Sequence, residues 1–315
     1  MTEAIEKAAD KLVPLHKNLD KDWNKIAEQE LDILFYPDIG MDPYTYFLSF
    51  ARLAPVQVVS WGHPETIGSP NIDYFISSEL IEFPGSAEQY KEQLALLSLL
   101  PTYYYRPETP ELTYGRADYS LPEQGALYVC PQTLFKFHPT FDPLIGELLR
   151  RDLDGYLVLI DDGKGGCWNK LILERLGSVC PDVTGRVIFV PRMDKNKFMG
   201  LILIADAVLD VPTFSGGNSS MEAFAMGAPI VTWPGDFMRS RVTAGCYKQM
   251  GISELTASDG EEYVSLALKL AQDIDFRSRM QGEIKANSHK LFERKEVVRE
   301  LEFFFVDAFK ALQKV

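Results

Sequence analysis

Short apolar runs alternate with longer amphipathic stretches from residue 125 to the end of the chain. The runs are rich in Val, Ile and Leu and are mostly followed by Pro or Asp, which is typical of buried strands. They cover residues 126–130, 156–160, 187–190, 207–211 and 230–232. The stretches between them predict helices near 141–152, 167–176, 195–204 and 219–226, and beyond Pro234 near 237–250, 260–273, 275–288 and 294–312. Strands separated by helices pair in parallel, so this α/β pattern predicts a complete Rossmann-like domain.

The first part of the chain carries a shorter version of the same pattern. Strands are predicted at 32–36, 55–59 and 73–76, with an apolar helix over 43–53. The first thirty residues are mostly helical in pattern, with a short strand expected at 12–15, and the proline-rich stretch 78–124 predicts a strand or two and then an interdomain crossing. We therefore expect residues 1–115 to form a partial Rossmann-like domain with its linker. Residues 116–315 are expected to form the second domain, including the C-terminal helices.

Composition places the chain among ordinary globular proteins. Its 315 residues are 46% hydrophobic and 24% charged, and the formal net charge of −13 argues against nucleic acid or an anionic membrane surface as the main partner. The four cysteines are widely spaced and there are only four histidines, so no zinc site and no disulfide framework is predicted. A reducing, cytoplasmic compartment follows from that cysteine usage. No signal peptide is evident, and no apolar run approaches the ~20 residues of a membrane span.

The stretch 205–227 passes from a predicted strand through a glycine loop into a helix. The loop is Ser215-Gly216-Gly217-Asn218, and the apolar helix is expected to begin near Ser219. Ser219 or Ser220 suits the helix cap, and Glu222 is expected in the first turn, at the positive end of the helix dipole. Free backbone N–H groups without an obstructing Cβ would make this loop an anion site. The alternative is an ordinary connection that uses its glycines only to turn.

Ligands of doubly wound sheets bind beyond the carboxyl ends of the strands, and the unusual loops of this chain lie there. Lys136 and His138 follow the strand 126–130, and Lys195 follows the strand 187–190. Two lysines, a glycine loop and a helix N-terminus on one edge suit a diphosphate. Each residue also has a structural interpretation: Lys136 as a lysine lying over a core edge, His138 as a backbone partner, Lys195 as a solvated helix start, and Glu222 as a dipole partner.

Several familiar motifs are missing. There is no Gly-x-x-x-x-Gly-Lys-Ser/Thr, no Gly-x-Gly-x-x-Gly after the first strand and no Gly-x-Ser-x-Gly. Their absence disfavours a P-loop kinase, a nicotinamide-dependent dehydrogenase and a serine hydrolase of the nucleophile-elbow type. Asp161-Asp162-Gly163 at a strand end could bind Mg²⁺, although the glycines that follow favour a flexible turn. We predict no metal site.

Four segments together carry a resemblance to a known family. They are 35–40 (Phe-Tyr-Pro-Asp-Ile-Gly), 52–68 (containing Ser-Trp-Gly-His-Pro-Glu-Thr-Ile-Gly), 72–76 (Ile-Asp-Tyr-Phe-Ile) and 216–232 (beginning Gly-Gly-Asn-Ser-Ser-Met-Glu-Ala-Phe). From about residue 30 onward the chain resembles the C-terminal catalytic region of protein O-linked N-acetylglucosamine transferases and SPINDLY-like proteins. It is also similar to the cytoplasmic protein N-glycosyltransferases.

The resemblance implies a GT-B fold with two Rossmann-like domains, the N-terminal one incomplete here. It implies an inverting, metal-independent transfer of a sugar, expected to be N-acetylglucosamine, from a UDP donor to Ser or Thr of an acceptor protein, with UDP-sugar as co-substrate and no other cofactor. By the same resemblance, Lys136 stabilises the departing diphosphate and Lys195 contacts the uridine. The remaining implied donor contacts are Gln132, Thr133, Gly216, Gly217, Asn218, Ser219 and Glu222, and the loop Gly62-His63-Pro64 faces sugar and acceptor.

The chain also departs from that family. Gly217 stands where the animal enzymes have a histidine, and the family's first domain normally begins well before residue 30. Tetratricopeptide repeats that present acceptors are absent, so we expect either a fragment of a protein with an upstream repeat domain, or a divergent member that needs a partner chain or has lost activity. His63 is the candidate catalytic histidine. Two further hypotheses stay open: an Asn-directed protein glucosyltransferase, and a nucleotide-sugar-binding module without turnover.

Overall fold

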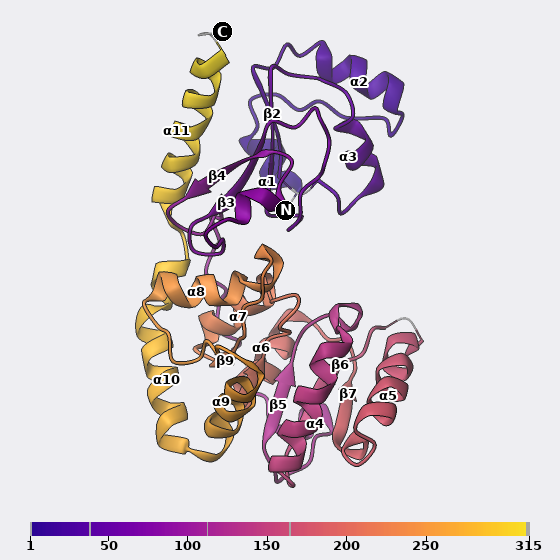
Figure 1. Ribbon diagram of the computed structural model, residues 1–315, viewed down its shortest axis with the longest axis vertical. Helices are drawn as coiled ribbons and strands as arrows, with labels where there is room; N and C mark the ends of the chain where they lie inside the picture. Colours follow the sequence, from indigo (N-terminus) through magenta and orange to yellow (C-terminus); the bar gives the residue numbers. More distant parts are fainter. Residues whose placement is uncertain (1, 38, 112, 164, 313–315) are drawn as a thin grey trace. The chain divides into compact units, whose positions relative to one another are not determined.

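The computed structural model describes residues 2–37, 39–111, 113–163 and 165–312, with side chains from residue 5. The chain forms two compact units (Figure 1). One contains Met1–Ser77, Gly85–Leu96 and Arg299–Val315, and the other contains Ser78–Pro84 and Leu97–Val298. Within the described residues, no helix combines the length and the apolar character that a membrane crossing would need.

The first unit is built on a four-stranded sheet in the order β1-β2-β3-β4. Its strands are β1 (Ile33–Tyr36), β2 (Val56–Ser60), β3 (Tyr74–Ser78) and β4 (Gln93–Leu97). The β1–β2 and β2–β3 pairs are parallel, as predicted, and every residue of β2 is buried. Helices α1 (Thr2–Ala8), α2 (Leu19–Ala27) and α3 (Pro43–Leu48) belong to the same unit.

The second unit is a doubly wound domain with a five-stranded parallel sheet in the order β7-β6-β5-β8-β9. The strands are β5 (Leu127–Cys130), β6 (Tyr156–Ile160), β7 (Val187–Val190), β8 (Ala207–Leu209) and β9 (Ile230–Val231). The order reverses beside β5, whose neighbours are β6 and β8. The loops that follow β5 and β8 therefore leave the sheet next to each other, where such folds bind their ligands.

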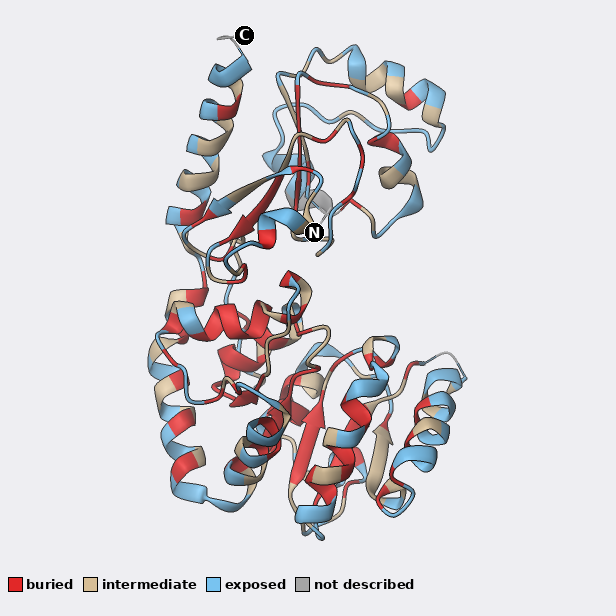
Figure 2. Ribbon diagram, viewed as in Figure 1, coloured by how far each residue is buried: buried red, intermediate tan, exposed pale blue. Residues whose placement is uncertain are grey.

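Helices cover both faces of this sheet. The helices of this unit are α4 (Asp142–Arg151), α5 (Cys167–Val179), α6 (Lys195–Leu203), α7 (Asn218–Met226), α8 (Val242–Met250), α9 (Gly260–Gln272) and α10 (Ile274–Asn287). The last helix, α11 (Lys295–Leu312), enters the first unit at Arg299. Right-handed crossovers place α4 and α5 on one face and α6 and α7 on the other, and each pair is in contact. Figure 2 shows burial concentrated in β5, β8, α7 and α8. These elements form the rigid base of the loops described below.

The structure departs from the sequence predictions in several elements. No strand forms at 12–15, the helix predicted over 43–53 ends at Leu48, and the one predicted from 237 begins at Val242 after a short 3₁₀ turn. The division of the chain also differs from the predicted boundary at residue 115. The last helix joins the first unit, because the rings of Phe304 and Phe305 pack on those of Tyr74 and Phe35 at 5.3 and 5.6 Å between centroids.

Candidate functional site

Two loops meet at the carboxyl edge of the second sheet. The amide of Gln132, after β5, donates to the backbone carbonyl of Phe214, after β8, over 3.1 Å. Lys136 ends a 3₁₀ turn (Leu134–Lys136), and its Nζ lies 3.9 Å from the centroid of the Phe214 ring. The loop after β5 thus brings its lysine onto the loop after β8.

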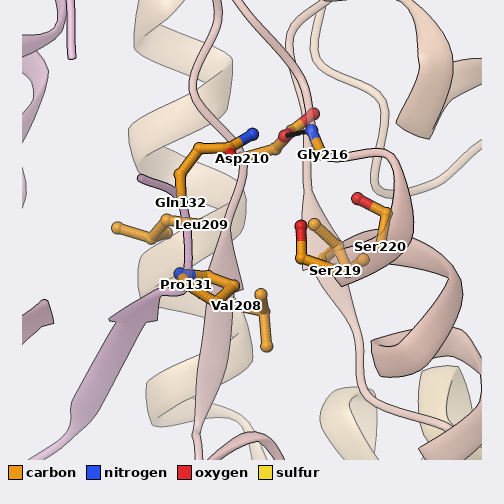
Figure 3. Close-up of a pocket in the computed structure, with 9 residues that line it drawn as sticks. Pro131, Gln132, Val208, Leu209, Asp210, Gly216, Ser219 and Ser220 are labelled. Atoms are coloured by element: carbon orange, nitrogen blue, oxygen red, sulfur yellow. Dashed lines mark hydrogen bonds between the residues drawn. The ribbon is translucent and has the colours of Figure 1, made fainter. Parts of the chain in front are cut away.

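Three hollows follow this edge. Gln132, Asp210, Gly216, Ser219 and Ser220 surround the smallest (Figure 3). A groove of about 650 Å³ contains Lys136 among the rings of Phe135, Phe137, Phe214 and Phe237. A third hollow of about 310 Å³ is lined by residues that include Gln132, Thr133, Asp161, Asp162, Arg192 and Met193. Gln132 borders the smallest and the third hollow, which therefore adjoin each other beyond the end of β5.

Lys136 is half-buried, and its ammonium has to be balanced by its surroundings. Burial lowers the pKa of Lys136, and the negative charge of Asp210 opposes that effect. The face of the Phe214 ring supplies a further favourable contact for the cation. Lys136 is therefore held at the sheet edge, in reach of the hollows, rather than extended into solvent.

Helix α7 begins at Asn218 without a side-chain cap. Its N-cap residue is Gly217, which has no side chain to accept the first N–H groups. The Ser220 hydroxyl is hydrogen-bonded to the Thr243 hydroxyl at 2.8 Å. Because the N-cap residue is Gly217, the prediction that Ser219 or Ser220 caps the helix is wrong. The N–H groups of Asn218, Ser219 and Ser220 lack partners within the helix, as those of any first turn do. An uncapped helix start of this kind suits an anionic ligand.

Glu222 lies beyond the first turn of α7, contrary to the prediction, because the helix begins at Asn218. Its Oε1 lies 4.0 Å from Nζ of Lys195, the first residue of α6. Burial raises the pKa of Glu222, and the charge of Lys195 opposes the rise. The structure therefore brings these two predicted site residues together, and Glu222 has a charged partner rather than only the helix dipole.

The two glycines of the loop differ in their surroundings. The Gly216 N–H donates to Oδ1 of Asp210 over 2.8 Å. The prediction that this N–H is free to bind a ligand is therefore wrong. A Cβ on Gly216 would lie 2.2 Å from the Ser220 Oγ and 2.8 Å from the Ser219 Oγ, whereas one on Gly217 would meet nothing within 4 Å. Gly216 is thus required for the close approach of loop and helix, and Gly217 leaves the helix start open.

Asp210 was missed by the sequence interpretation, although it occupies the centre of the site. It follows β8 directly, is 4% exposed, and accepts from the Gly216 N–H and from the Thr232 hydroxyl at 2.7 Å. Burial raises its pKa to about 6. The sequence signal was an acidic residue closing an apolar strand just before a glycine loop, which is an unfavourable place for a charge unless it has partners.

Three further polar residues at this edge, Asp161, Asp162 and His138, have structural partners. Asp162 accepts from the Trp168 N–H at the start of α5, and Asp161 accepts from the Asn169 amide, so both carboxylates organise a turn. Across the described parts of the chain, no cluster of three His, Cys, Asp or Glu side chains could hold a metal ion. His138 accepts from the Thr140 N–H, which agrees with its structural interpretation.

His63 belongs to the first unit, whereas the other predicted site residues belong to the second. It follows β2, and its half-buried ring packs on Gly40, where a Cβ would lie 2.5 Å from the His63 Cδ2. Glu92 holds the rest of this loop by accepting from the Thr66 hydroxyl at 2.6 Å and the Ile67 N–H at 2.9 Å. The loop is thus fixed by a buried carboxylate that the sequence interpretation did not identify, and the role of His63 stays a prediction.

The chain is similar to known glycosyltransferases. The probable UDP-N-acetylglucosamine–peptide N-acetylglucosaminyltransferase SEC of Arabidopsis thaliana is 26% identical over 261 residues, which are 79% of this chain and 26% of that protein. The UDP-glucose:protein N-beta-glucosyltransferase of Actinobacillus pleuropneumoniae is 26% identical over 263 residues, which are 81% of this chain and 41% of that protein. The chain therefore spans less than half the length of either relative.

Solved structures agree with the fold. A mutant of the Thermobaculum terrenum O-GlcNAc transferase matches with a TM-score of 0.84 at 24% identity, over 99% of this chain and 60% of that one. A sucrose-phosphate synthase from Thermosynechococcus elongatus matches with a TM-score of 0.59 at 14% identity, over 96% and 82%. These matches confirm the predicted GT-B class of fold. The family model for glycosyl transferase family 41 matches residues 106–301, more than half of the chain, and the protein therefore belongs to that family.

Proposed function

We propose that this chain is an inverting, metal-independent glycosyltransferase that moves N-acetylglucosamine from a UDP donor to Ser or Thr of proteins. The observation that carries the proposal is the position of Lys136 on the ring of Phe214, in the loop that leads into the uncapped start of α7. The family membership supports the reaction class, and the similarity to peptide N-acetylglucosaminyltransferases supports a protein acceptor. The UDP-sugar is the co-substrate, and no further cofactor is proposed.

The diphosphate is assigned to Lys136 and the first turn of α7. Negative charge grows on the diphosphate as the bond to the sugar breaks. Donors fixed beforehand at that position stabilise the transition state more than the ground state, and they act strongly in a partly buried site. Lys136 and the N–H groups of Asn218 and Ser219 are such donors, because a 3₁₀ turn and a helix built on the packed sheet hold them.

The nucleoside is assigned to the Lys195–Glu222 pair and the hollow beside Gln132 and Thr133. A half-buried carboxylate with one charged partner at 4.0 Å retains acceptor capacity for ribose hydroxyl groups. The hollow of about 310 Å³ has both polar and apolar lining, which suits a base. Lys195 begins α6 and Glu222 lies on α7, and both helices follow strands of the second sheet, so one UDP molecule would lie along the carboxyl edge of that sheet.

The reaction is tested by incubating the protein with UDP-N-acetylglucosamine or UDP-glucose and a peptide library, followed by mass spectrometry. Transfer of N-acetylglucosamine to Ser or Thr supports the proposal. Glucose on Asn would instead establish the alternative activity, which the protein N-beta-glucosyltransferase activity of the Actinobacillus pleuropneumoniae relative favours. Calorimetric binding of UDP without product on any acceptor would identify a nucleotide-sugar-binding module.

Replacing Gly216 with alanine is expected to lower UDP affinity roughly ten-fold or more. The new methyl group would lie 2.2 Å from the Ser220 Oγ, so the start of α7 must move, and such overpacking typically costs about 1–3 kcal/mol. Calorimetry with UDP measures the effect. Gly177→Ala on α5 is the control, because its Cβ would be in open space and lies outside the site. Equal affinities for the two variants would contradict the assignment of the α7 start.

Replacing Glu222 with alanine is expected to weaken UDP binding roughly ten-fold and to leave pyrophosphate binding unchanged. A hydrogen bond to a charged group contributes about 1.5–3 kcal/mol. UDP would lose such a bond between its ribose and Glu222, whereas pyrophosphate has no ribose. Competition binding with UDP and with pyrophosphate distinguishes the two ends of the ligand. Glu174→Ala removes a comparable carboxylate, 3.7 Å from Lys170 on α5, and serves as control. Parallel losses for both ligands would contradict the nucleoside assignment.

A further inference from the structure

Arg175 of α5 binds two other segments of the second unit at once. Its Nε and Nη2 donate to the two carboxylate oxygens of Asp142, the first residue of α4, over 2.5 and 2.8 Å. Its Nη1 donates to the backbone carbonyl of Phe137 over 2.9 Å. The Asp142 side chain is fully buried and that of Arg175 is 28% exposed, so solvent screens this pair much less than a surface ion pair. One guanidinium thus joins α5, the start of α4 and the loop that follows β5.

The carbonyl that Arg175 binds belongs to the residue directly after Lys136. Phe137 closes the 3₁₀ turn that carries Lys136, and its buried ring packs on that of Phe141 at 5.7 Å between centroids. The backbone of the turn is therefore held by ring packing and by the hydrogen bond from Arg175. From this fixed backbone the Lys136 side chain extends onto the ring of Phe214.

We propose that Arg175 is a positioning residue of this site, which fixes the backbone at Phe137 and thereby the place of the Lys136 ammonium. The inference rests on the proposed function for the task of Lys136 at the diphosphate, whereas the place of the ammonium can be measured by itself. A lysine ammonium is a point charge on a flexible stem, so its position depends on where the backbone holds that stem. Arg175 contacts no part of the ligand in this scheme.

The three bonds require the planar fork of an arginine. Two of its nitrogens match the two oxygens of one carboxylate, and the third nitrogen remains in the same plane for the carbonyl of Phe137. A lysine at this position keeps a positive charge for Asp142 but has a single nitrogen. Arg175→Lys is therefore expected to keep the ion pair and to lose the bond to Phe137.

The place of the ammonium is measured by NMR after reductive ¹³C-methylation of the lysines, with the Lys136 signal assigned by its absence in Lys136→Arg. Methylated ammonium groups still bind aromatic faces, and an aromatic ring shifts the signals of protons above its face upfield. In the wild type, the methyl signal of Lys136 should therefore lie upfield of the signals of exposed lysines. In Arg175→Lys, this upfield shift should be largely lost.

Arg150→Lys is the matched control. Arg150, at the other end of α4, donates to both oxygens of Asp182 over 2.8 Å each, and Asp182 follows α5. The Lys136 signal should stay upfield in this variant. With the unmodified proteins, kcat should fall roughly ten- to a hundred-fold in Arg175→Lys, since a misplacement of about 1 Å can cost about 10²-fold. The KM for the donor should change much less, and Arg150→Lys should leave both constants unchanged.

The double variant Arg175→Met/Asp142→Leu provides a second test, because removing both charges of a buried pair is often tolerated where removing one is not. It also removes the donor to Phe137 and should lose the upfield shift. The inference is overturned if the Lys136 signal stays in place in these folded variants, if it moves equally in Arg150→Lys, or if it is not upfield in the wild type. A kcat at the wild-type level in Arg175→Lys, despite a moved signal, also overturns it. If the signal moves as expected but the wild type transfers no sugar to any acceptor, the placement by Arg175 stands and the proposed function fails.

Discussion

Lys136→Ala is expected to slow sugar transfer by roughly 10²–10³-fold, the usual cost of removing one preorganised donor to a developing anion. The half-buried ammonium is held on the Phe214 ring at the edge of the sheet, and an alanine leaves the developing charge on the diphosphate without a cation at that point. The loss should fall mainly on kcat, because the interaction is strongest in the transition state. Steady-state kinetics with saturating donor, together with UDP calorimetry, separates the two effects.

The fold should survive this change, since Lys136 is not a core residue. The thermal unfolding midpoint of the Lys136→Ala protein is therefore expected to match that of the wild type. Lys170→Ala, which removes an exposed lysine of α5 paired with Glu174, is the control for a general change in charge. A Lys136→Ala protein that transfers sugar as fast as the wild type would refute the catalytic assignment and leave Lys136 as a lysine that merely covers a core edge.

Leu201→Ala is expected to lower the free energy of unfolding of the second unit by about 2–5 kcal/mol, the range for large-to-small changes at well-packed sites. Leu201 is fully buried on α6, the helix that packs on α7 and begins at Lys195. Truncation would leave a cavity between the sheet and these helices, because close-packed interiors relax only partly. Urea unfolding followed by fluorescence and circular dichroism measures the change.

Leu203 offers a matched comparison two residues further along the same helix. It is 44% exposed, so Leu203→Ala should change the free energy of unfolding by no more than about 0.5 kcal/mol. The two variants share helix, residue type and substitution and differ in burial. Similar losses in both would contradict the role given to the burial of Leu201, since alanine has the higher helix propensity and cannot by itself cause a loss.

The elements of the second unit follow closely from local pattern. The strands predicted at 156–160 and 187–190 are β6 and β7, residue for residue. The pattern is strong there because strands of a parallel sheet with helices on both faces are near-continuous apolar runs. The first unit was less predictable: Leu12–Leu15 is apolar but forms no strand, and the helix after Pro43 stops at Leu48. Short apolar segments have no periodicity of their own, so tertiary packing decides their conformation.

The candidate site, too, was predictable from the sequence only in part. Lys136, Lys195 and the glycine loop were predicted from their places after successive strands, because the carboxyl ends of parallel strands meet at one edge. The Lys195–Glu222 pair, the unavailable N–H of Gly216 and the absence of a serine cap were not predictable. Each depends on where α7 begins and on which side chains surround that start, and a shift of one residue changes every contact of the first turn.

The sequence by itself determined the family, the parallel second sheet and the edge at which chemistry-bearing residues gather, since these depend on periodicity and on order along the chain. Only the tertiary structure decided that Asp210 and Glu92 are buried carboxylates holding the two loops, and that the last helix returns to the first unit. Those features join residues far apart in the chain. Their physical basis is the partnering of buried polar groups and rings across elements, which no local pattern encodes.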